Sequence, residues 1–225
     1  MQDQPVDEKY YEVAGPGSLG ERLIIAARDG IYDDFVRLCA PTPDSRILDF
    51  GVSDVVTPGA NLMERKYPNL EKITAVGLSN AADFRSAYPA VNYVRTEPYA
   101  RLPFAEKHFD IATSNAVLEH MGSRQNQKFM VDELFRVARQ VFITVPHRYF
   151  PVEHHTAIPL LHYWTPAFRI GCHILKKSDW TRDENLILMS RGRLRSLLPA
   201  GTSADIGMTG IRLGPLSSNL YLHGV

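Results

Sequence analysis

Hydrophobic residues along the chain follow two alternating patterns, which together predict an α/β fold. After Ser18, apolar residues recur at three- and four-residue steps up to residue 38, which predicts one amphipathic helix or two short ones broken at Gly30. From Ser45 onward, short apolar runs alternate with helical segments. This alternation is typical of right-handed crossovers and of a parallel sheet covered by helices on both faces.

The predicted elements follow one another closely from Ser45 to the end of the chain. The expected strands are residues 47–50, 73–78, 91–94, 111–114, 141–145, 204–213 and 219–223. The expected helices are residues 60–67, 81–88, 123–139, 157–174 and 186–198. Gly214-Pro215 separates the last two strands, so we expect them to form an antiparallel pair.

We expect a single main domain, because 225 residues with 44% hydrophobic content can bury one sizeable core. Residues 1–44 are expected to form a polar segment and a helix packed on the core, with residues 1–17 loose or strapped across the surface. Residues 45–225 are expected to form the domain itself. Residues 147–180 are rich in aromatic residues, His and Pro, and we interpret them as an insertion.

Charge, cysteine content and the lengths of apolar runs indicate which partners and which compartment to expect. Lys plus Arg and Asp plus Glu are both 25, so no basic field is available to hold a nucleic acid. Cys39 and Cys172 form no CxxC pair, which indicates a reducing compartment. No apolar run approaches the ~20 residues that cross a bilayer. We therefore expect a cytoplasmic protein without a transmembrane segment, and peripheral membrane association stays open.

The strand that begins at Ile47 ends in Asp49-Phe50-Gly51, which predicts a ligand-binding turn. In an open parallel sheet, ligands bind beyond the carboxyl ends of the strands, and a glycine there lets the backbone approach the ligand closely. The alternative is an ordinary turn in which a buried Asp accepts hydrogen bonds from nearby backbone N–H groups.

Two blocks in this order carry a resemblance to a known family. The blocks are SRILDFG at residues 45–51 and FDIATSNAVLEH at residues 109–120. They resemble the type 11 class I S-adenosyl-L-methionine-dependent methyltransferases. The resemblance implies S-adenosyl-L-methionine as cofactor and a Rossmann-like, mainly parallel seven-stranded sheet with an antiparallel C-terminal strand pair and helices on both faces.

The resemblance also implies cofactor-binding positions, with departures from the family pattern. The implied cofactor residues are Asp49, Gly51, Ser53, Gly77, Ser79, Glu97 and Asn115. Ser53 stands where the family has its second glycine, and Gly77 stands where it has an acid for the ribose hydroxyls. Ser79 or Asn80 would replace that acid with a neutral hydrogen bond, at a cost of about 1 kcal/mol. Glu97 would accept a hydrogen bond from the adenine amino group.

Glu119-His120 follows the fourth strand of the core, where the family faces its acceptor. An imidazole titrates near ~6.5, so His120, and secondarily His155, are candidate general bases. The alternative is that Glu119 and His120 only hydrogen-bond the following loop. The expected substrate contacts are Glu119, His147, Tyr149, Glu153 and His154. We predict no metal site, because adjacent His154 and His155 point in different directions and the spacing matches no closed site.

Blocks in residues 122–164 and Ser218-Asn219-Leu220 resemble a bacterial subgroup associated with surface-polysaccharide and glycolipid biosynthesis. The first functional hypothesis is therefore O-methylation of a small, glycan-linked or lipid-linked acceptor. The second is a methyltransferase-like binding or scaffold protein without turnover, because the glycine motif and the ribose acid are altered. A nicotinamide oxidoreductase fits less well, since the chain has no complete G-x-G-x-x-G motif.

Overall fold

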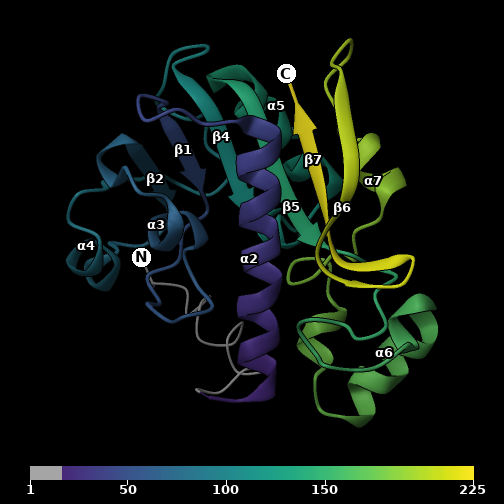
Figure 1. Cartoon of the computed structure of the whole chain (residues 1–225). Helices are drawn as coiled ribbons and strands as arrows, with labels where there is room; N and C mark the ends of the chain where they lie inside the picture. Colours follow the sequence, from purple (N-terminus) through teal and green to yellow (C-terminus); the bar gives the residue numbers. More distant parts are fainter. Residues whose placement is uncertain (1–16) are drawn as a thin grey trace.

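A seven-stranded sheet forms the centre of the protein (Figure 1). The computed structural model describes residues 17–225. The strands are β1 (Ile47–Phe50), β2 (Ile73–Gly77), β3 (Asn92–Arg95), β4 (Phe109–Asn115), β5 (Ala138–Pro146), β6 (Ala204–Leu213) and β7 (Leu216–Gly224), in the order β3-β2-β1-β4-β5-β7-β6. The first five are parallel, whereas β7 is antiparallel to both β5 and β6. The predicted fold class is confirmed.

Helices lie on both faces of the sheet (Figure 1). They are α2 (Leu19–Cys39), α3 (Leu62–Lys66), α4 (Ala82–Ala87), α5 (Arg124–Val137), α6 (Thr165–Ile174) and α7 (Arg191–Arg195). Short 3-10 turns occur at Leu70–Lys72, Leu118–His120, Leu161–Tyr163 and Ser178–Thr181. Because side chains alternate along β1, Ile47 packs with α2 and α3 on one face, and Leu48 packs with α5 on the other.

Helix α2 is continuous through Gly30, so the expected option of two helices is wrong. Ser18 caps its start by accepting a hydrogen bond from the Glu21 backbone N–H at 3.1 Å. A Cβ at position 30 would lie 3.1 Å from the carbonyl oxygen of Gly210 in β6. Gly30 therefore allows close approach of the helix to the sheet and does not interrupt the helix.

Two predicted helices are shorter in the structure. The helix expected over 157–174 begins at Thr165, because Pro159 and Leu160, whose φ is 59°, turn the chain before it. The helix expected over 186–198 is limited to α7, because residues 186–189 are extended: the Ile187 N–H donates to the Glu119 carbonyl, and the Met189 carbonyl accepts from Arg148. The expectation for residues 1–16 lies outside the described residues.

Candidate active site

The candidate site lies at the carboxyl ends of β1 and β4, where the order of the strands in the sheet changes direction. β2 and β4 lie on either side of β1, so the connections that leave β1 and β4 diverge at their carboxyl ends. This topological switch point is where open parallel sheets bind ligands. The residues predicted from the sequence fall at the carboxyl ends of β1, β2 and β4, on the loops after β1 to β4, and in the insertion after β5.

The loop after β1 begins with a tight turn at Gly51. The backbone N–H groups of Gly51 and Val52 both donate to the Val76 carbonyl, at 2.8 and 3.1 Å. Gly51 has a φ of 90°, and a Cβ there would lie 2.4 Å from a methyl group of Val117. The glycine is thus required both by its backbone angle and by contact with the segment after β4.

Ser53 closes the same loop on itself. Its N–H donates to the Asn61 side-chain oxygen at 3.0 Å, and its hydroxyl accepts from the Val55 N–H at 3.0 Å. The Asn61 amide donates in turn to the carbonyls of Ser53 and Val55. Asn61, buried at the start of α3, thereby fixes the loop that a glycine-rich sequence would leave open.

A pair of buried acids lies beside this loop. Asp49 at the end of β1 is 6% exposed and Glu64 in α3 is 3% exposed. Burial raises the pKa of Asp49 to about 7, and burial together with the charge of Asp49 raises the pKa of Glu64 well above its usual value. A side-chain hydrogen bond joins the two acids, so they share a proton, and no other residue among 17–225 donates to the Glu64 oxygens. A positively charged ligand group would satisfy this pair.

The acid pair of Asp49 and Glu64 indicates how the loop after β1 could bind S-adenosyl-L-methionine. The methionine end of this cofactor carries an ammonium group beside its sulfonium, and both are cations. Asp49 and Glu64 are at the end of β1, where the resemblance places that part of the cofactor, and a bound cation would favour release of the proton that they share. The methionine end of the implied cofactor therefore fits the residues present.

The region expected to bind the ribose departs from the family pattern. A Cβ at Gly77 would lie 2.6 Å from the Tyr93 hydroxyl, so the position where the acid is expected has no room for a side chain. That hydroxyl donates to the Ser79 carbonyl at 2.8 Å, while the Ser79 side chain accepts from the Ala81 N–H. Glu97, in the loop after β3, is exposed. Among the predicted residues, only Ser79 and Glu97 offer polar side-chain groups to the ribose and adenine at this end of the site.

The segment after β4 carries the candidate bases. Asn115 ends β4 and accepts a hydrogen bond from the Thr144 hydroxyl in β5. Glu119 and His120 follow in a 3-10 turn, and the Glu119 side chain is 1% exposed. Burial raises the pKa of Glu119 to about 7 and lowers the pKa of His120 to about 3. Burial therefore favours the neutral form of both neighbours.

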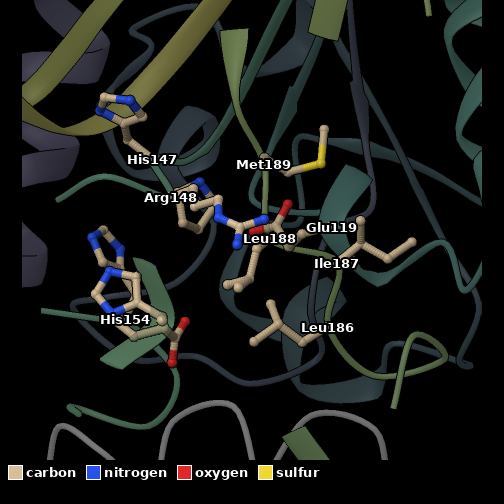
Figure 2. Close-up of a pocket in the computed structure, with 11 residues that line it drawn as sticks. Glu119, His147, Arg148, His154, Leu186, Ile187, Leu188 and Met189 are labelled. Atoms are coloured by element: carbon tan, nitrogen blue, oxygen red, sulfur yellow. The ribbon is translucent and has the colours of Figure 1, made fainter. Parts of the chain in front are cut away.

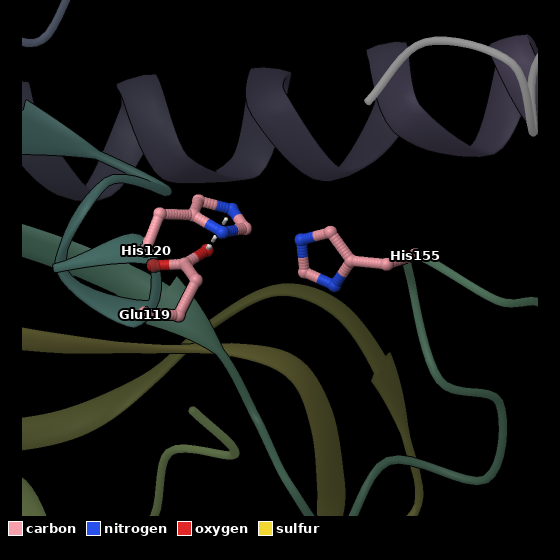
Figure 3. Close-up of side chains that lie close together, drawn as sticks. All are labelled: Glu119, His120 and His155. Atoms are coloured by element: carbon pink, nitrogen blue, oxygen red, sulfur yellow. Dashed lines mark ion pairs between the residues drawn. The ribbon is translucent and has the colours of Figure 1, made fainter. Parts of the chain in front are cut away.

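The structure brings His155 to these two residues from the insertion after β5 (Figure 3). The rings of His120 and His155 lie edge to face with centroids 4.9 Å apart. His155 Nδ1 lies 2.8 Å from a Glu153 carboxylate oxygen. Burial alone would lower the pKa of His155, but the charge of Glu153 and this hydrogen bond raise it. The predicted pair Glu119-His120 and the separately predicted His155 thus form one cluster.

His147, His154 and Glu119 line a narrow cleft with a volume of about 10 Å³ (Figure 2). His147 Nδ1 lies 3.1 Å from the Ser217 carbonyl oxygen of β7. Tyr149 remains 46% exposed at the outside of this region. The insertion has a small core of its own, formed by Ile158, Phe168, Cys172 and Leu186. These contacts keep the predicted substrate residues next to the carboxyl end of β5.

Sequence reasoning missed residues whose roles depend on contacts. Glu64 was assigned no role, although an acid inside the apolar stripe of Leu62 and Met63 is a detectable signal. Trp180, whose ring centroid lies 4.9 Å from that of His155, and the carbonyl of Asn185, 2.6 Å from His120 Nδ1, gave no such signal.

Comparisons with known proteins agree with this architecture. Residues 54–141 match the family model described as a methyltransferase domain, so the match begins after Gly51 and includes the block from Phe109 to His120. No curated protein sequence matches the chain.

Several solved structures share the fold at low sequence identity. A SAM-dependent methyltransferase from Thermotoga maritima has a TM-score of 0.56 at 14% identity, with 92% of this chain and 91% of that chain covered. Magnesium protoporphyrin IX methyltransferase from Synechocystis PCC 6803 with bound SAH has a TM-score of 0.58 at 14% identity, covering 96% and 92%. A Rhodobacter sphaeroides protein assigned by name to the zinc-dependent alcohol dehydrogenases has a TM-score of 0.59 at 12% identity, covering 85% and 87%.

Proposed function

We propose that this chain, an S-adenosyl-L-methionine-dependent methyltransferase by its domain match and fold, methylates a hydroxyl group of a glycan-linked or lipid-linked acceptor. The cluster of Glu119, His120 and His155 at the end of β4 is the observation that carries the proposal. It supplies polar groups to an acceptor at the edge of the sheet where the cofactor-binding loop also lies.

The loop after β1 and helix α3 would hold the methionine end of the cofactor. Asp49 and Glu64 would become negatively charged against the cationic groups of the cofactor, and the Gly51 turn keeps the backbone close to Val117. Bound S-adenosyl-L-methionine would supply the methyl group to the acceptor oxygen, with S-adenosylhomocysteine as the leaving group and the hydroxyl proton passing to Glu119. The chain's own contribution is to orient the two reactants in line, and orientation alone removes a large part of such a barrier.

The acceptor hydroxyl would bind against the Glu119 carboxylate. This carboxylate is buried, and neither of its oxygens has a hydrogen-bond partner among the described residues. A hydroxyl donor would satisfy it. Leaving a buried polar group without a hydrogen bond costs about 1–3 kcal/mol, and a charged group costs more. An acceptor that arrives with its O–H at this point is therefore recognised by the site.

The outer surface of helix α6 supports the proposal that the acceptor is carried on a membrane surface. Its outer side exposes apolar side chains, with Ile174 71% exposed and Ile170 60% exposed, and Trp164 before it is 67% exposed. Residues 160–178 contain Arg169, Lys176 and Lys177 and no acidic residue. An apolar face with a basic rim is complementary to an anionic lipid surface. No helix within residues 17–225 is long and apolar enough to cross a membrane.

The sequence resemblance supports a place in surface-polysaccharide or glycolipid assembly, and the unpaired thiols of Cys39 and Cys172 support a cytoplasmic location. Both thiols are buried, and burial raises the pKa of the Cys39 thiol to about 12. Neither cysteine is therefore suited to catalysis.

The test is transfer of a labelled methyl group from S-adenosyl-L-methionine to candidate acceptors: free sugars, lipid-linked sugars and a membrane lipid extract. We expect label in a lipid-linked or glycan-linked hydroxyl, and we expect Glu119→Gln to reduce kcat by about 10² or more. Label found only on amines, or a Glu119→Gln variant with unchanged kcat on its best acceptor, would contradict the proposal.

A further inference from the structure

We propose that Glu119, His120 and His155 bind a divalent first-row transition-metal ion. The inference deepens the proposed function. It rests on that function in one respect only, namely that the bound ion would also bind the oxygen of the acceptor. The metal site itself depends on the geometry of this cluster and of the groups behind it.

The three side chains converge from two separate segments (Figure 3). Their potential ligand atoms all lie within 4.8 Å of one another, and His120 Nε2 is 3.9 Å from Glu119 Oε1. Atoms bound to one ion at about 2.1 Å lie roughly 3–3.5 Å apart. A contraction of at most about 1.3–1.8 Å would therefore bring all three ligand atoms within reach of one ion, and rotation of the side chains can supply it.

Each imidazole is already oriented through its other nitrogen. His120 Nδ1 lies 2.6 Å from the Asn185 carbonyl oxygen, which can only accept, so the proton of the neutral ring is on Nδ1. The Nε2 lone pair of His120 then faces the Glu119 carboxylate. A cation between these two atoms would be attracted by both.

His155 is held by a carboxylate in the way that metal-binding histidines commonly are. Its Nδ1 donates to Glu153, whose other oxygen accepts from the backbone N–H groups of His155 and Thr156 and from the Thr156 hydroxyl. Such a carboxylate behind a histidine fixes the ring and increases the basicity of the ligating nitrogen. Glu153 is therefore a positioning residue for the ion.

Glu119 supplies the independent sign of a ligand. Its side chain is 1% exposed, and neither carboxylate oxygen has a hydrogen-bond partner among residues 17–225. Arg28 and His155 lie close enough to act on this carboxylate by charge but donate no hydrogen bond to it, and a buried carboxylate is typically hydrogen-bonded or bound to a metal. Its place beside two imidazole rings makes a cation the partner that fits.

Two imidazoles and one carboxylate are ligands that suit Zn²⁺, Mn²⁺ and Fe²⁺. Three protein ligands leave one to three coordination positions for water or substrate. An acceptor with two neighbouring oxygens, such as the vicinal diol of a sugar, would fill them and be oriented by the ion. The ion would also lower the pKa of a bound hydroxyl and so favour its attack on the methyl group.

The experiment is calorimetric titration of tag-free, EDTA-treated and dialysed protein with MnCl₂ and with ZnCl₂. We expect saturable binding of one ion per chain by wild type. Glu119→Gln, which keeps the side-chain shape, should bind at least ~100-fold more weakly, and Glu153→Gln about 10–100-fold more weakly. His173→Ala, an exposed histidine of α6 outside the cluster, is the matched control and should bind as wild type does.

Circular dichroism and S-adenosylhomocysteine affinity on the same preparations show whether each variant is folded. If wild type binds neither ion saturably, or if Glu119→Gln binds as tightly as wild type, the metal site is refuted. Failure of metal binding with intact S-adenosylhomocysteine binding leaves the proposed function in place. Metal binding without methyl transfer to any hydroxyl would refute the proposed function and leave the metal site in place.

Discussion

Replacing Gly51 with alanine tests how the cofactor loop is coupled to the segment that carries Glu119 and His120. The structure predicts two separate costs. A side chain at a φ of 90° strains the backbone by about 1–3 kcal/mol. A new Cβ 2.4 Å from a methyl group of Val117 overpacks the contact, at a further cost of about 1–3 kcal/mol.

The two costs can be separated with a second substitution. Val117→Ala removes both methyl groups that the new Cβ would meet, at 2.4 and 2.9 Å, and leaves only the Val117 Cβ at 3.2 Å. In that background Gly51→Ala should cost only the backbone term. The double-mutant cycle should therefore show a coupling energy of about 1–3 kcal/mol, measured by urea denaturation of the four proteins.

The reasoning fails if Gly51→Ala costs the same in both backgrounds, because then no contact joins the loop to Val117. S-adenosylhomocysteine titration of the same four proteins adds a functional measure. We expect the Gly51→Ala single variant to bind more weakly than the double variant, since Val117 and the loop can no longer both keep their positions.

Two further predictions concern the acid pair and the outer face of α6. Because burial raises the pKa of Asp49 to about 7 and that of Glu64 well above its usual value, the folded state binds protons more tightly, and stability should fall as pH rises from ~4 through ~7. Glu64→Gln should reduce this fall in urea denaturation at several pH values and weaken S-adenosyl-L-methionine binding; an unchanged pH profile would contradict the raised pKa. Ile174→Asp should abolish co-sedimentation with anionic phospholipid vesicles while the exposed-surface control Asp83→Asn leaves it intact, and equal sedimentation of the two variants would contradict membrane docking by α6.

The sheet was predictable from sequence because its strands are short, nearly continuous apolar runs. Ile111 and Phe142, for example, lie in runs that have no polar face because helices cover both sides. The ends of elements were less predictable where tertiary hydrogen bonds decide them, as at Ile187, whose N–H bonds to the segment after β4 and holds the chain extended.

The site was predictable only in part. His120 follows β4 directly, so its place at the carboxyl edge follows from topology. That His155 meets it depends on the path of the insertion, which turns at Ala157 and Leu160 with positive φ values of 57° and 59°. Asn61 satisfying Ser53, and Tyr93 filling the space beside Gly77, are likewise contacts between segments distant in sequence that no local pattern encodes.

Calorimetric titration of the wild-type protein with S-adenosylhomocysteine tests the central claim most directly, that the altered loop after β1 still binds the cofactor. The account predicts saturable binding of one molecule per chain, with a gain in stability of about 2.7 kcal/mol at ~100 times Kd and a melting temperature several degrees higher. No heat of binding and no shift in melting temperature at millimolar ligand would contradict it and would favour a scaffold protein that only shares the fold.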